Sequence, residues 1–206
     1  MSALNGIGGN GIWLSLALSF MAFASFSWAI RGHFVTTGRI PNGMRYLSLI
    51  SLLSYISFVT LVVTRRHDVV PGRVMMPAIL TLAGLVLFIL SIGVFWWAIT
   101  TTRRQRLKLA HSDADPSFIY SSGPYAHVRH PFYCAYILFW IGTALVAGGW
   151  QWLPAIILTA WYIHVARSEE QRFGHSAVAH GYDAYRQRTG MLLPRLTRRP
   201  HPPIAH

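Results

Sequence analysis

The stretch FYCAYILFWIGTALVAGGWQWLPAIILTAWYIHVA, from Phe132 to Ala166, decides the fold of this chain. It contains two apolar runs, Phe132–Gly148 and Gln151–Ala166, that are joined by only a few residues around GGWQW. Such runs are typical of helices that enter a bilayer, and a connection this short makes neighbouring helices antiparallel. The sequence therefore predicts a tight helical hairpin in a membrane, with Trp150 and Trp152 at the level of the lipid headgroups.

Three more apolar runs precede this hairpin, at Gly11–Ile30, Arg45–Thr64 and Met76–Thr101. A helix of about 20 residues crosses the roughly 30 Å hydrocarbon core of a bilayer. Hydrophobic residues make up 53% of the chain and charged residues only 12%, whereas soluble proteins carry about 25% charged residues. All six acidic residues lie outside the apolar runs. We therefore predict an all-α fold, a polytopic membrane helix bundle with five transmembrane helices and a cytoplasmic helical C-terminal tail.

The basic residues are divided unevenly between the two ends of the predicted bundle. With five spans, the N-terminus, the loop at 64–76 and the hairpin turn share one side, which carries Arg65, Arg66 and Arg73. The other side carries many more: Arg31, Arg39, Arg45, Arg103, Arg104, Arg106, Lys108, Arg129 and the residues from Arg167 onward. The positive-inside rule predicts an outside N-terminus and a cytoplasmic C-terminus, in the inner membrane if the cell is bacterial. The net charge of +12 reflects this bias, and it favours membrane lipids over nucleic acid as partners.

The composition of the chain changes once, near residue 101. Residues 1–101 hold three predicted spans and short basic loops, so we expect an N-terminal scaffold. Residues 102–196 hold a polar segment, the hairpin and an amphipathic helical pattern that is interrupted around GHSAVAHG; we expect this region to bind the cofactor and carry the chemistry. Residues 197–206 are predicted to be a disordered tail. Three residues recur at three-residue steps and so share one face of the C-terminal helix: Tyr182, Tyr185 and Arg188.

The polar stretch GPYAHVRHPFY, from Gly123 to Tyr133, leads into the first helix of the hairpin. Gly-Pro indicates a turn, and Pro131 suits the first position of a helix, where its missing N–H costs nothing. The free backbone amides that follow form a positively polarised helix N-terminus, which binds carboxylates and phosphates. His127, Arg129 and His130 crowd the same point. The alternative interpretation is a cap at the membrane interface whose basic residues face lipid headgroups.

A second polar motif, ARSEEQ at Ala166–Gln171, ends the second helix of the hairpin. Because the hairpin is tight, we expect Glu169 and Glu170 to return beside Arg129 and His130. Successive helix positions point about 100° apart, so only one of the two carboxylates can face fully inward. The alternative is an ion-pair network that only holds the hairpin to the tail. The functional interpretation is a mixed-charge pocket for a ligand that carries both a negative and a positive group.

These elements together resemble the isoprenylcysteine carboxyl methyltransferase and phospholipid methyltransferase superfamily. The resemblance rests on GPYAHVRHPFY, the hairpin, the Glu pair and the tail GYDAYRQRTGMLLPRL, and it runs from Ser122 to Leu196. It implies an integral membrane methyltransferase that binds S-adenosyl-L-methionine at the cytoplasmic face. It also implies a lipophilic acceptor that enters from the bilayer, either an isoprenylcysteine-type carboxylate or a lipid headgroup. No protein partner is predicted.

The resemblance assigns expected roles to residues of this chain. The carboxylate of the cofactor is expected near His130–Tyr133, its cationic end or ribose near Glu169 or Glu170, and its adenine against Tyr125, Val128 or Tyr182. The predicted cofactor-binding set is Tyr125, His127, Val128, His130, Pro131, Tyr133, Glu169, Glu170 and Tyr182. The predicted catalytic set is Arg129, Arg167 and Glu170. A carboxylate acceptor would be oriented by Arg129 or Arg167, and an amine acceptor would need a base, with Glu169, Glu170 or His127 as candidates.

Two other functions are compatible with parts of the sequence. Membrane sterol and steroid reductases, which use NADPH, resemble the C-terminal half, but they read Asn-Tyr-x-Gly-Glu where this chain reads PFYCAY. A non-enzymatic membrane scaffold is the second alternative. No metal site is expected, because Cys134 is the single cysteine and the histidines show no ligand spacing. His164 lies inside the predicted fifth span, where an ionisable group is a functional candidate by default or a hydrogen-bond partner of a neighbouring helix.

Overall fold

The computed structural model describes residues 2–34, 42–64, 75–103, 118–174, 176 and 178–195. These ranges form helices and contain no β-strand, which confirms the all-α prediction. The elements are α1 (Ser2–Gly32), α2 (Asn42–Thr64), α3 (Met75–Thr102), η2 (Gly123–Ala126), α4 (Pro131–Ala147), η3 (Gly149–Gln151), α5 (Trp152–Gly174) and α6 (Ala179–Arg188). The predicted disordered tail at 197–206 and the basic residues Arg39, Arg65, Arg66, Arg73, Arg104, Arg106 and Lys108 lie outside the described residues.

All five predicted apolar runs are helices, but they differ in how well they suit a membrane. Within the described ranges, three stretches are long and apolar enough to cross one: Gly11–Gly32 of α1, all of α2, and Ala78–Thr102 of α3. The fourth helix, α4, is apolar but only 17 residues long. The fifth, α5, continues to Gly174, past the predicted end at Ala166, and so includes the polar residues around the Glu pair. The chain is an integral membrane protein, and the count of five spans stays a prediction.

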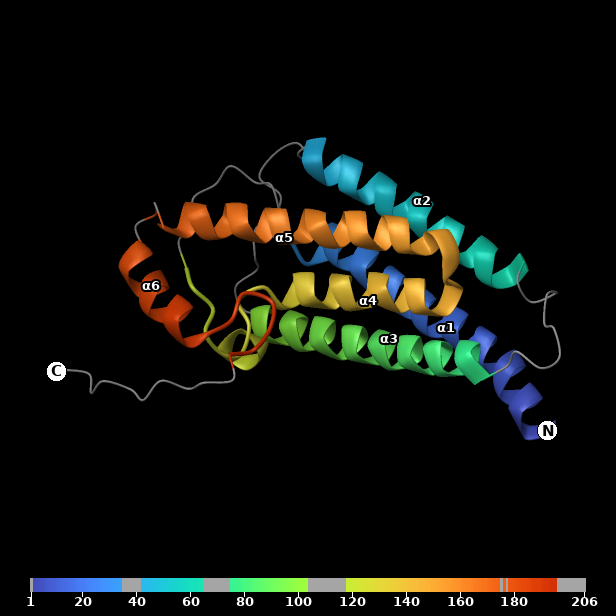
Figure 1. Cartoon of the computed structure of the whole chain (residues 1–206). Coiled ribbons are helices and arrows are strands. Elements are labelled where there is room, and N and C mark those ends of the chain that lie inside the picture. Colours follow the sequence, from blue (N-terminus) through green and yellow to red (C-terminus); the bar gives the residue numbers. More distant parts are fainter. Residues whose placement is uncertain are drawn as a thin grey trace.

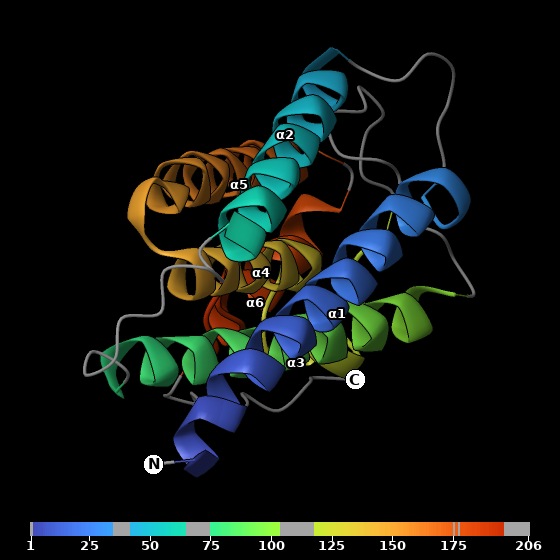
Figure 2. The ribbon, with the colours of Figure 1, turned by 90° about the vertical axis from the view of Figure 1, so that its right-hand side faces the viewer.

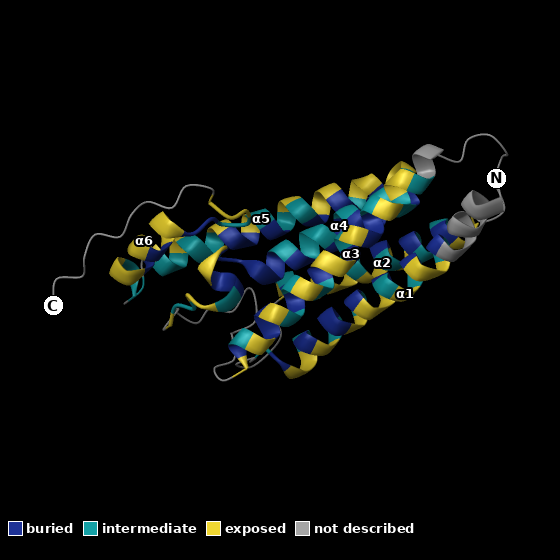
Figure 3. Cartoon of the chain, turned by 90° about the horizontal axis from the view of Figure 1, so that it is seen from below, coloured by how far each residue is buried: buried dark blue, intermediate teal, exposed yellow. Residues whose placement is uncertain are grey.

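The long helices lie roughly along one direction and wrap around α4 (Figures 1 and 2). The hairpin partners α4 and α5 are antiparallel, α3 runs along α4 on the other side, and α2 crosses over the turn of the hairpin. The outward faces are apolar and exposed (Figure 3), with Phe20, Leu82 and Ile156 each more than half exposed. Exposed apolar bands of this kind are suited to contact with lipid tails.

The contact between α3 and α4 depends on two glycines. A Cβ atom on Gly142 would lie 3.2 Å from the carbonyl oxygen of Gly84 and 2.9 Å from Cε1 of Phe88. A Cβ atom on Gly84 would lie 2.5 Å from Cγ2 of Val146. The two backbones therefore approach closely, which is how membrane helices pack without a hydrophobic effect between them.

Aromatic side chains fill the space between α1, α3 and α4. The ring of Phe26 lies 4.8 Å from Phe95, 4.8 Å from Tyr136 and 5.4 Å from Phe139, measured between ring centroids. The edge-to-face angles of the last two pairs are those that aromatic rings prefer. Small residues such as Ala22 and Ala29 are fully buried on the same side of α1, so the large rings meet a small-residue face.

A buried amide anchors the turn of the hairpin to α2. Gly148 and Gly149 have φ angles of 61° and 56°, a left-handed conformation that glycine adopts without steric cost. Gln151, which is fully buried, accepts a hydrogen bond from Ser57 Oγ at 3.2 Å and donates from Nε2 to Thr143 Oγ1 at 3.4 Å. These contacts fix the turn of the hairpin on α2, so the start of α4 and the end of α5 are held at the same level at its opposite end.

Candidate active site

The chain reaches α4 through a short turn that is packed on the end of α3. The η2 turn is closed by bonds from the N–H of His127 to the carbonyl of Pro124 at 3.1 Å and from the N–H of Val128 to the same oxygen at 3.0 Å. Gly123 starts the turn with φ 59°, and a Cβ atom there would lie 2.4 Å from Thr101 Oγ1. Glycine is therefore required by both the conformation and the close approach to α3.

The segment after α6 pairs with the segment before α4 in a strand-like way. Val128 and Gly190 form an isolated parallel bridge. The N–H of Arg129 donates to the carbonyl of Gly190 at 2.8 Å, and the N–H of His130 donates to the carbonyl of Met191 at 3.2 Å. The C-terminal segment thus lies across the entrance of α4, and α6 is brought to the same end of the bundle.

Arg129 joins three elements at this end. Its Nε donates to Oε1 of Glu170 at 2.7 Å, and its Nη1 donates to the carbonyls of Thr189 and of Arg186, the latter at 3.3 Å. The Arg129 side chain is only 6% exposed. A guanidinium can serve a carboxylate and backbone carbonyls at once because its donors point in fixed, separate directions. The start of α4, the end of α5 and α6 therefore meet at one buried cation.

His130 lies between the two carboxylates of α5. Its Nδ1 is 3.5 Å from Oε2 of Glu169, and its Nε2 is 3.3 Å from Oε1 of Glu170. The Nε2 atom is buried and has no partner with hydrogen-bond geometry among the described residues. Tyr133, one turn into α4, donates its hydroxyl to Oε1 of Glu169 at 2.7 Å. We call Arg129, His130, Glu169 and Glu170 the charged cluster.

The charged cluster shifts the pKa values of His130 and Glu170. Burial acts to raise the pKa of Glu170, but the hydrogen bonds and charges of His130 and Arg129 outweigh it and lower this pKa to about 2. Burial acts to lower the pKa of His130, but the adjacent carboxylates of Glu169 and Glu170 outweigh it and raise this pKa above its ordinary value. The arrangement therefore stabilises a protonated His130 beside an ionised Glu170.

Aromatic residues of η2, α5 and α6 surround the charged cluster. Tyr182 stacks on Phe173 with ring centroids 4.5 Å apart, and Tyr185 donates its hydroxyl to the carbonyl of Tyr125 at 2.7 Å. The Tyr125 ring lies 5.4 Å from Tyr120. The Tyr125 hydroxyl is buried and has no hydrogen-bond partner among the described residues.

The first turn of α4 leaves backbone donors available. His130 precedes the helix without a side-chain cap. The first i to i−4 bond of the helix runs from the N–H of Cys134 to the carbonyl of His130 at 3.0 Å. The amides of Phe132 and Tyr133 come before this bond and belong to the group of N–H donors that a helix cannot satisfy internally. They lie beside His130 at the positive end of the helix dipole.

The structure brings most of the predicted site residues to one end of the bundle. Arg129, His130, Pro131, Tyr133, Glu169 and Glu170 adjoin one another, with Tyr125, Val128 and Tyr182 buried around them. Two predicted residues are placed elsewhere. The exposed His127 directs its ring toward Trp97 of α3, with centroids 5.9 Å apart. Arg167 is exposed on α5, and within the described residues no hydrogen bond or ion pair joins it to the charged cluster.

Sequence reasoning missed several residues that build this site. Tyr185 and the carbonyls of Arg186, Thr189 and Gly190 all hold the cluster in place. The shared face of Tyr182 and Tyr185 was a usable signal for Tyr185. The carbonyl contacts had none, because any residue type provides a backbone carbonyl.

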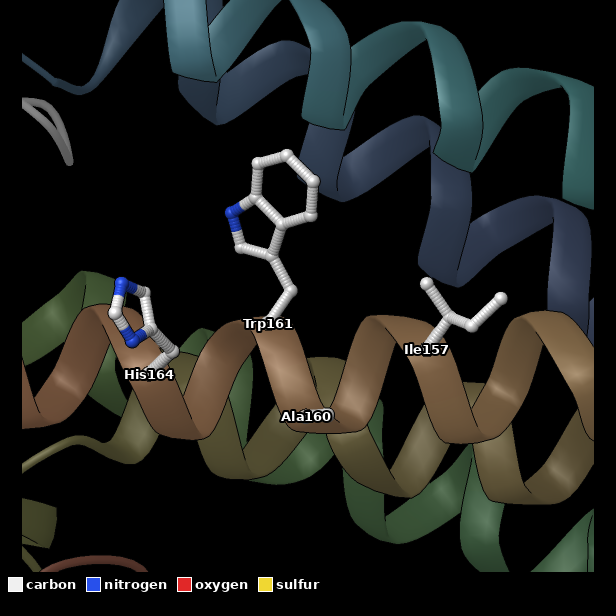
Figure 4. A pocket seen from close by; sticks show the side chains of 4 residues that line it. All are labelled: Ile157, Ala160, Trp161 and His164. Atoms are coloured by element: carbon white, nitrogen blue, oxygen red, sulfur yellow. The ribbon is translucent and has the colours of Figure 1, made fainter.

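A separate hollow lies on the side of α5 from which Ile157 and Trp161 point toward α1 and α2 (Figure 4). It encloses about 460 Å³ and is lined by Ile157, Ala160, Trp161 and His164. His164 is exposed there and does not belong to the charged cluster. No group of three or more His, Cys, Asp or Glu side chains suited to a metal ion occurs in the described part of the chain.

A comparison with protein families gives one match. Residues 79–176 match a family model described as phospholipid methyltransferase. The match runs from α3 to the end of α5 and so includes the entrance of α4, the hairpin and the Glu pair, whereas α6 lies just beyond it. No curated protein matches the chain.

Proposed function

We propose that this chain, a member of the isoprenylcysteine and phospholipid methyltransferase superfamily through residues 79–176, uses S-adenosyl-L-methionine to methylate a lipophilic acceptor. Its family implies a membrane methyltransferase. The observation that supports the choice of cofactor is the charged cluster at the entrance of α4. There, the first amides of α4 and the carboxylates of Glu169 and Glu170 lie around His130.

The residues present fit a zwitterionic sulfonium nucleoside. The amides of Phe132 and Tyr133 and the adjacent His130 suit its carboxylate. Glu169 suits a cationic group or the ribose hydroxyls, and Tyr125, Val128 and Tyr182 offer apolar or aromatic surface for adenine. The buried Tyr125 hydroxyl has no hydrogen-bond partner among the described residues. Buried polar atoms are nearly always paired, so this hydroxyl is suited to a bound ligand.

The residues of this chain would act mainly by alignment. When bound, the cofactor supplies an already activated methyl group, so the protein needs to orient the acceptor and exclude water. For an amine acceptor, Glu169 is accessible enough to take up the proton, being 27% exposed. For a carboxylate acceptor, Arg129 and Arg167 remain the predicted orienting groups. The acceptor class therefore stays open between an isoprenylcysteine-type carboxylate and a lipid headgroup.

The proposed orientation puts the charged cluster in the cytoplasm. The C-terminal ends of α1 and α3 lie at the same end of the bundle as the start of α4 (Figure 1). Arg31 lies in the last turn of α1, Arg103 directly follows α3, and Arg129 shortly precedes α4. Clustering of basic residues at one end favours a cytoplasmic location for that end. The N-terminus would then be outside, and the acceptor would enter from the bilayer while the cofactor arrives from the cytosol.

Equilibrium binding to the purified protein in detergent tests this proposal. Labelled S-adenosyl-L-methionine should bind, S-adenosyl-L-homocysteine should displace it, and NADPH should not. As a control, the D183N variant should bind like the wild type, because Asp183 is exposed on α6 outside the charged cluster. Binding of NADPH alone would favour the reductase alternative, and binding of neither would favour the scaffold. Methyl transfer to an isoprenylcysteine analogue or to phosphatidylethanolamine, offered separately in liposomes, would then identify the acceptor.

A further inference from the structure

The two adjacent carboxylates of α5 differ in how many of their hydrogen-bonding positions are taken by other residues of the protein. Oε1 of Glu170 accepts from Arg129 Nε at 2.7 Å and lies 3.3 Å from His130 Nε2. Its Oε2 lies 3.9 Å from Arg186 Nε, and the side chain is 9% exposed. Glu170 therefore has cationic neighbours on both oxygens and little open surface for a ligand.

The Glu169 carboxylate can accept further hydrogen bonds. One oxygen accepts from the Tyr133 hydroxyl at 2.7 Å, and the other lies 3.5 Å from His130 Nδ1. An ionised carboxylate offers about four lone-pair positions, so two near neighbours leave room for more. The Glu169 side chain is 27% exposed, three times the 9% of Glu170. Glu169 is the member of the pair that a ligand can reach.

Tyr125 adds a second unused polar group at this end of the bundle. Its carbonyl is held by the Tyr185 hydroxyl at 2.7 Å, whereas its own hydroxyl is buried without a partner among the described residues. Burial raises the pKa of Tyr125, and Tyr185, Tyr120 and the Glu169 carboxylate raise it further, so the hydroxyl keeps its proton. Buried hydroxyls in native proteins are rarely left unpaired.

We propose that the Glu pair divides two tasks. Glu170 is a positioning residue: through Arg129 it fixes α6 and the segment after it on the entrance of α4. Glu169 is the ligand-contacting carboxylate, and the Tyr125 hydroxyl is its companion. Glu169 accepts from a cationic or N–H or O–H donor group of the bound methyl donor, and Tyr125 completes its hydrogen bonding on the same ligand. The identity of the ligand rests on the proposed function, but the task of Glu170 does not.

Two isosteric neutralisations, E169Q and E170Q, separate the tasks in the full-length protein in detergent. E170Q should lower the Tm and speed tryptic cleavage after the arginines of α6, because Arg129 loses its charged partner. E169Q should lower the Tm less than E170Q and keep the wild-type cleavage rate of α6, but weaken binding of S-adenosyl-L-homocysteine about tenfold or more, the effect of losing a hydrogen bond to a charged group. E169D, which keeps the charge, should recover part of that affinity.

A double-mutant cycle tests whether Glu170 acts through Arg129. Residues that act as one unit have non-additive effects. The loss of S-adenosyl-L-homocysteine affinity in R129Q/E170Q should therefore equal that of the weaker-binding single variant. If the fold-loss of affinity in the double variant equals the product of the fold-losses in the two single variants, Glu170 acts independently of Arg129, and the positioning role would be wrong.

Tyr125 is tested against its hydrogen-bonded neighbour. Y125F removes an unpaired hydroxyl, so it should leave the Tm unchanged or raised while weakening binding of S-adenosyl-L-homocysteine several-fold. Y185F removes a paired hydroxyl, so it should lower the Tm. Wild-type affinity in Y125F would overturn the ligand contact.

Three further outcomes decide the proposal. Wild-type affinity in E169Q, or unchanged protease resistance of α6 in E170Q, would overturn the division of tasks. If the wild-type protein binds neither S-adenosyl-L-methionine nor S-adenosyl-L-homocysteine, the proposed function fails and the assignment of Glu169 and Tyr125 fails with it. The cleavage rate of E170Q still decides the task of Glu170 in that case.

Discussion

Arg129 Nε and Glu170 Oε1 lie 2.7 Å apart, although 41 positions and both helices of the hairpin separate the two residues in the chain. The pair is buried, with side chains 6% and 9% exposed. Breaking a buried ion pair by removing one partner leaves an uncompensated charge, which is strongly destabilising. This contact therefore forms only when the start of α4 and the end of α5 lie side by side.

The charged cluster predicts a stability maximum at mildly acidic to neutral pH. The folded pKa of Glu170 is about 2, below its ordinary 4.5, so its contribution is present above about pH 4.5 and is lost as the pH falls toward 2. The folded pKa of His130 is raised above 6.5, so its contribution is complete below pH 6.5 and is lost as the pH rises through the folded value. Tm measured against pH should therefore fall on both sides. H130Q should remove the loss on the alkaline side, and an unchanged alkaline side in H130Q would contradict this assignment.

Lysine should not replace Arg129, despite its equal charge. Arg129 serves Glu170 and the carbonyls of Arg186 and Thr189 from one planar group, whereas lysine offers a single compact ammonium. R129K should lower the Tm and loosen α6, which hydrogen exchange of its amides would report. R188K is the control, because Arg188 is exposed on the same helix. Equal exchange rates in R129K and the wild type would mean that charge alone holds α6.

Gly190 should tolerate no side chain. A Cβ atom there would lie 1.6 Å from the carbonyl oxygen of Leu193, so the backbone that bonds Arg129 must move. G190A should destabilise the C-terminal segment by at least about 2 kcal/mol, in the range of overpacking. G181A is the matched control: its Cβ would meet nothing nearer than Ile119 Cδ1 at 3.7 Å. Alanine should stabilise α6 by roughly 0.5 kcal/mol there. Chemical denaturation in detergent compares the two, and equal stabilities would contradict the close contact.

Gly142 should be the sensitive position of the α3–α4 contact. A leucine there would meet Phe88 and the Gly84 carbonyl, both within 3.2 Å of the new Cβ, and push the helices apart. G142L should lower the Tm and weaken ligand binding, because α4 carries the charged cluster. G93L tests the effect of leucine itself in α3, since no atom lies within 4 Å of a Cβ at Gly93. A larger loss of Tm in G93L than in G142L would be inconsistent with a tight contact between α3 and α4.

The sequence predicted which residues meet where the charged cluster forms. Two apolar runs joined by GGWQW leave only one arrangement, an antiparallel hairpin, and this places Glu169 and Glu170 beside His130. The end of α5 was harder to predict. Hydropathy falls at Ala166, but the helix continues to Gly174, because polarity marks the limit of the membrane rather than the limit of helical hydrogen bonding.

Other features of the site could not be predicted from residue types. The pairing of Val128 with Gly190 is made by backbone atoms, and the approach of Gly84 to Gly142 depends on how two distant helices pack. His127 is two residues from Arg129, yet its ring lies toward Trp97 because the η2 turn sets its direction. The sequence predicted that only one of Glu169 and Glu170 faces fully inward, but which of them is buried follows from the rotation of α5.

The bridge between Val128 and Gly190 has a consequence for biogenesis. The residues that complete the site are made only after the whole hairpin, so the earlier part of the chain waits with an unfinished entrance to α4. The segment before α4 and the segment after α6 can meet only if α5 returns the chain to the end of the bundle where α4 begins, as it does around Arg129. A chain that inserted just one of these helices would separate the two halves permanently. Correct insertion is thus a precondition for forming the charged cluster, and a misassembled copy would lack it.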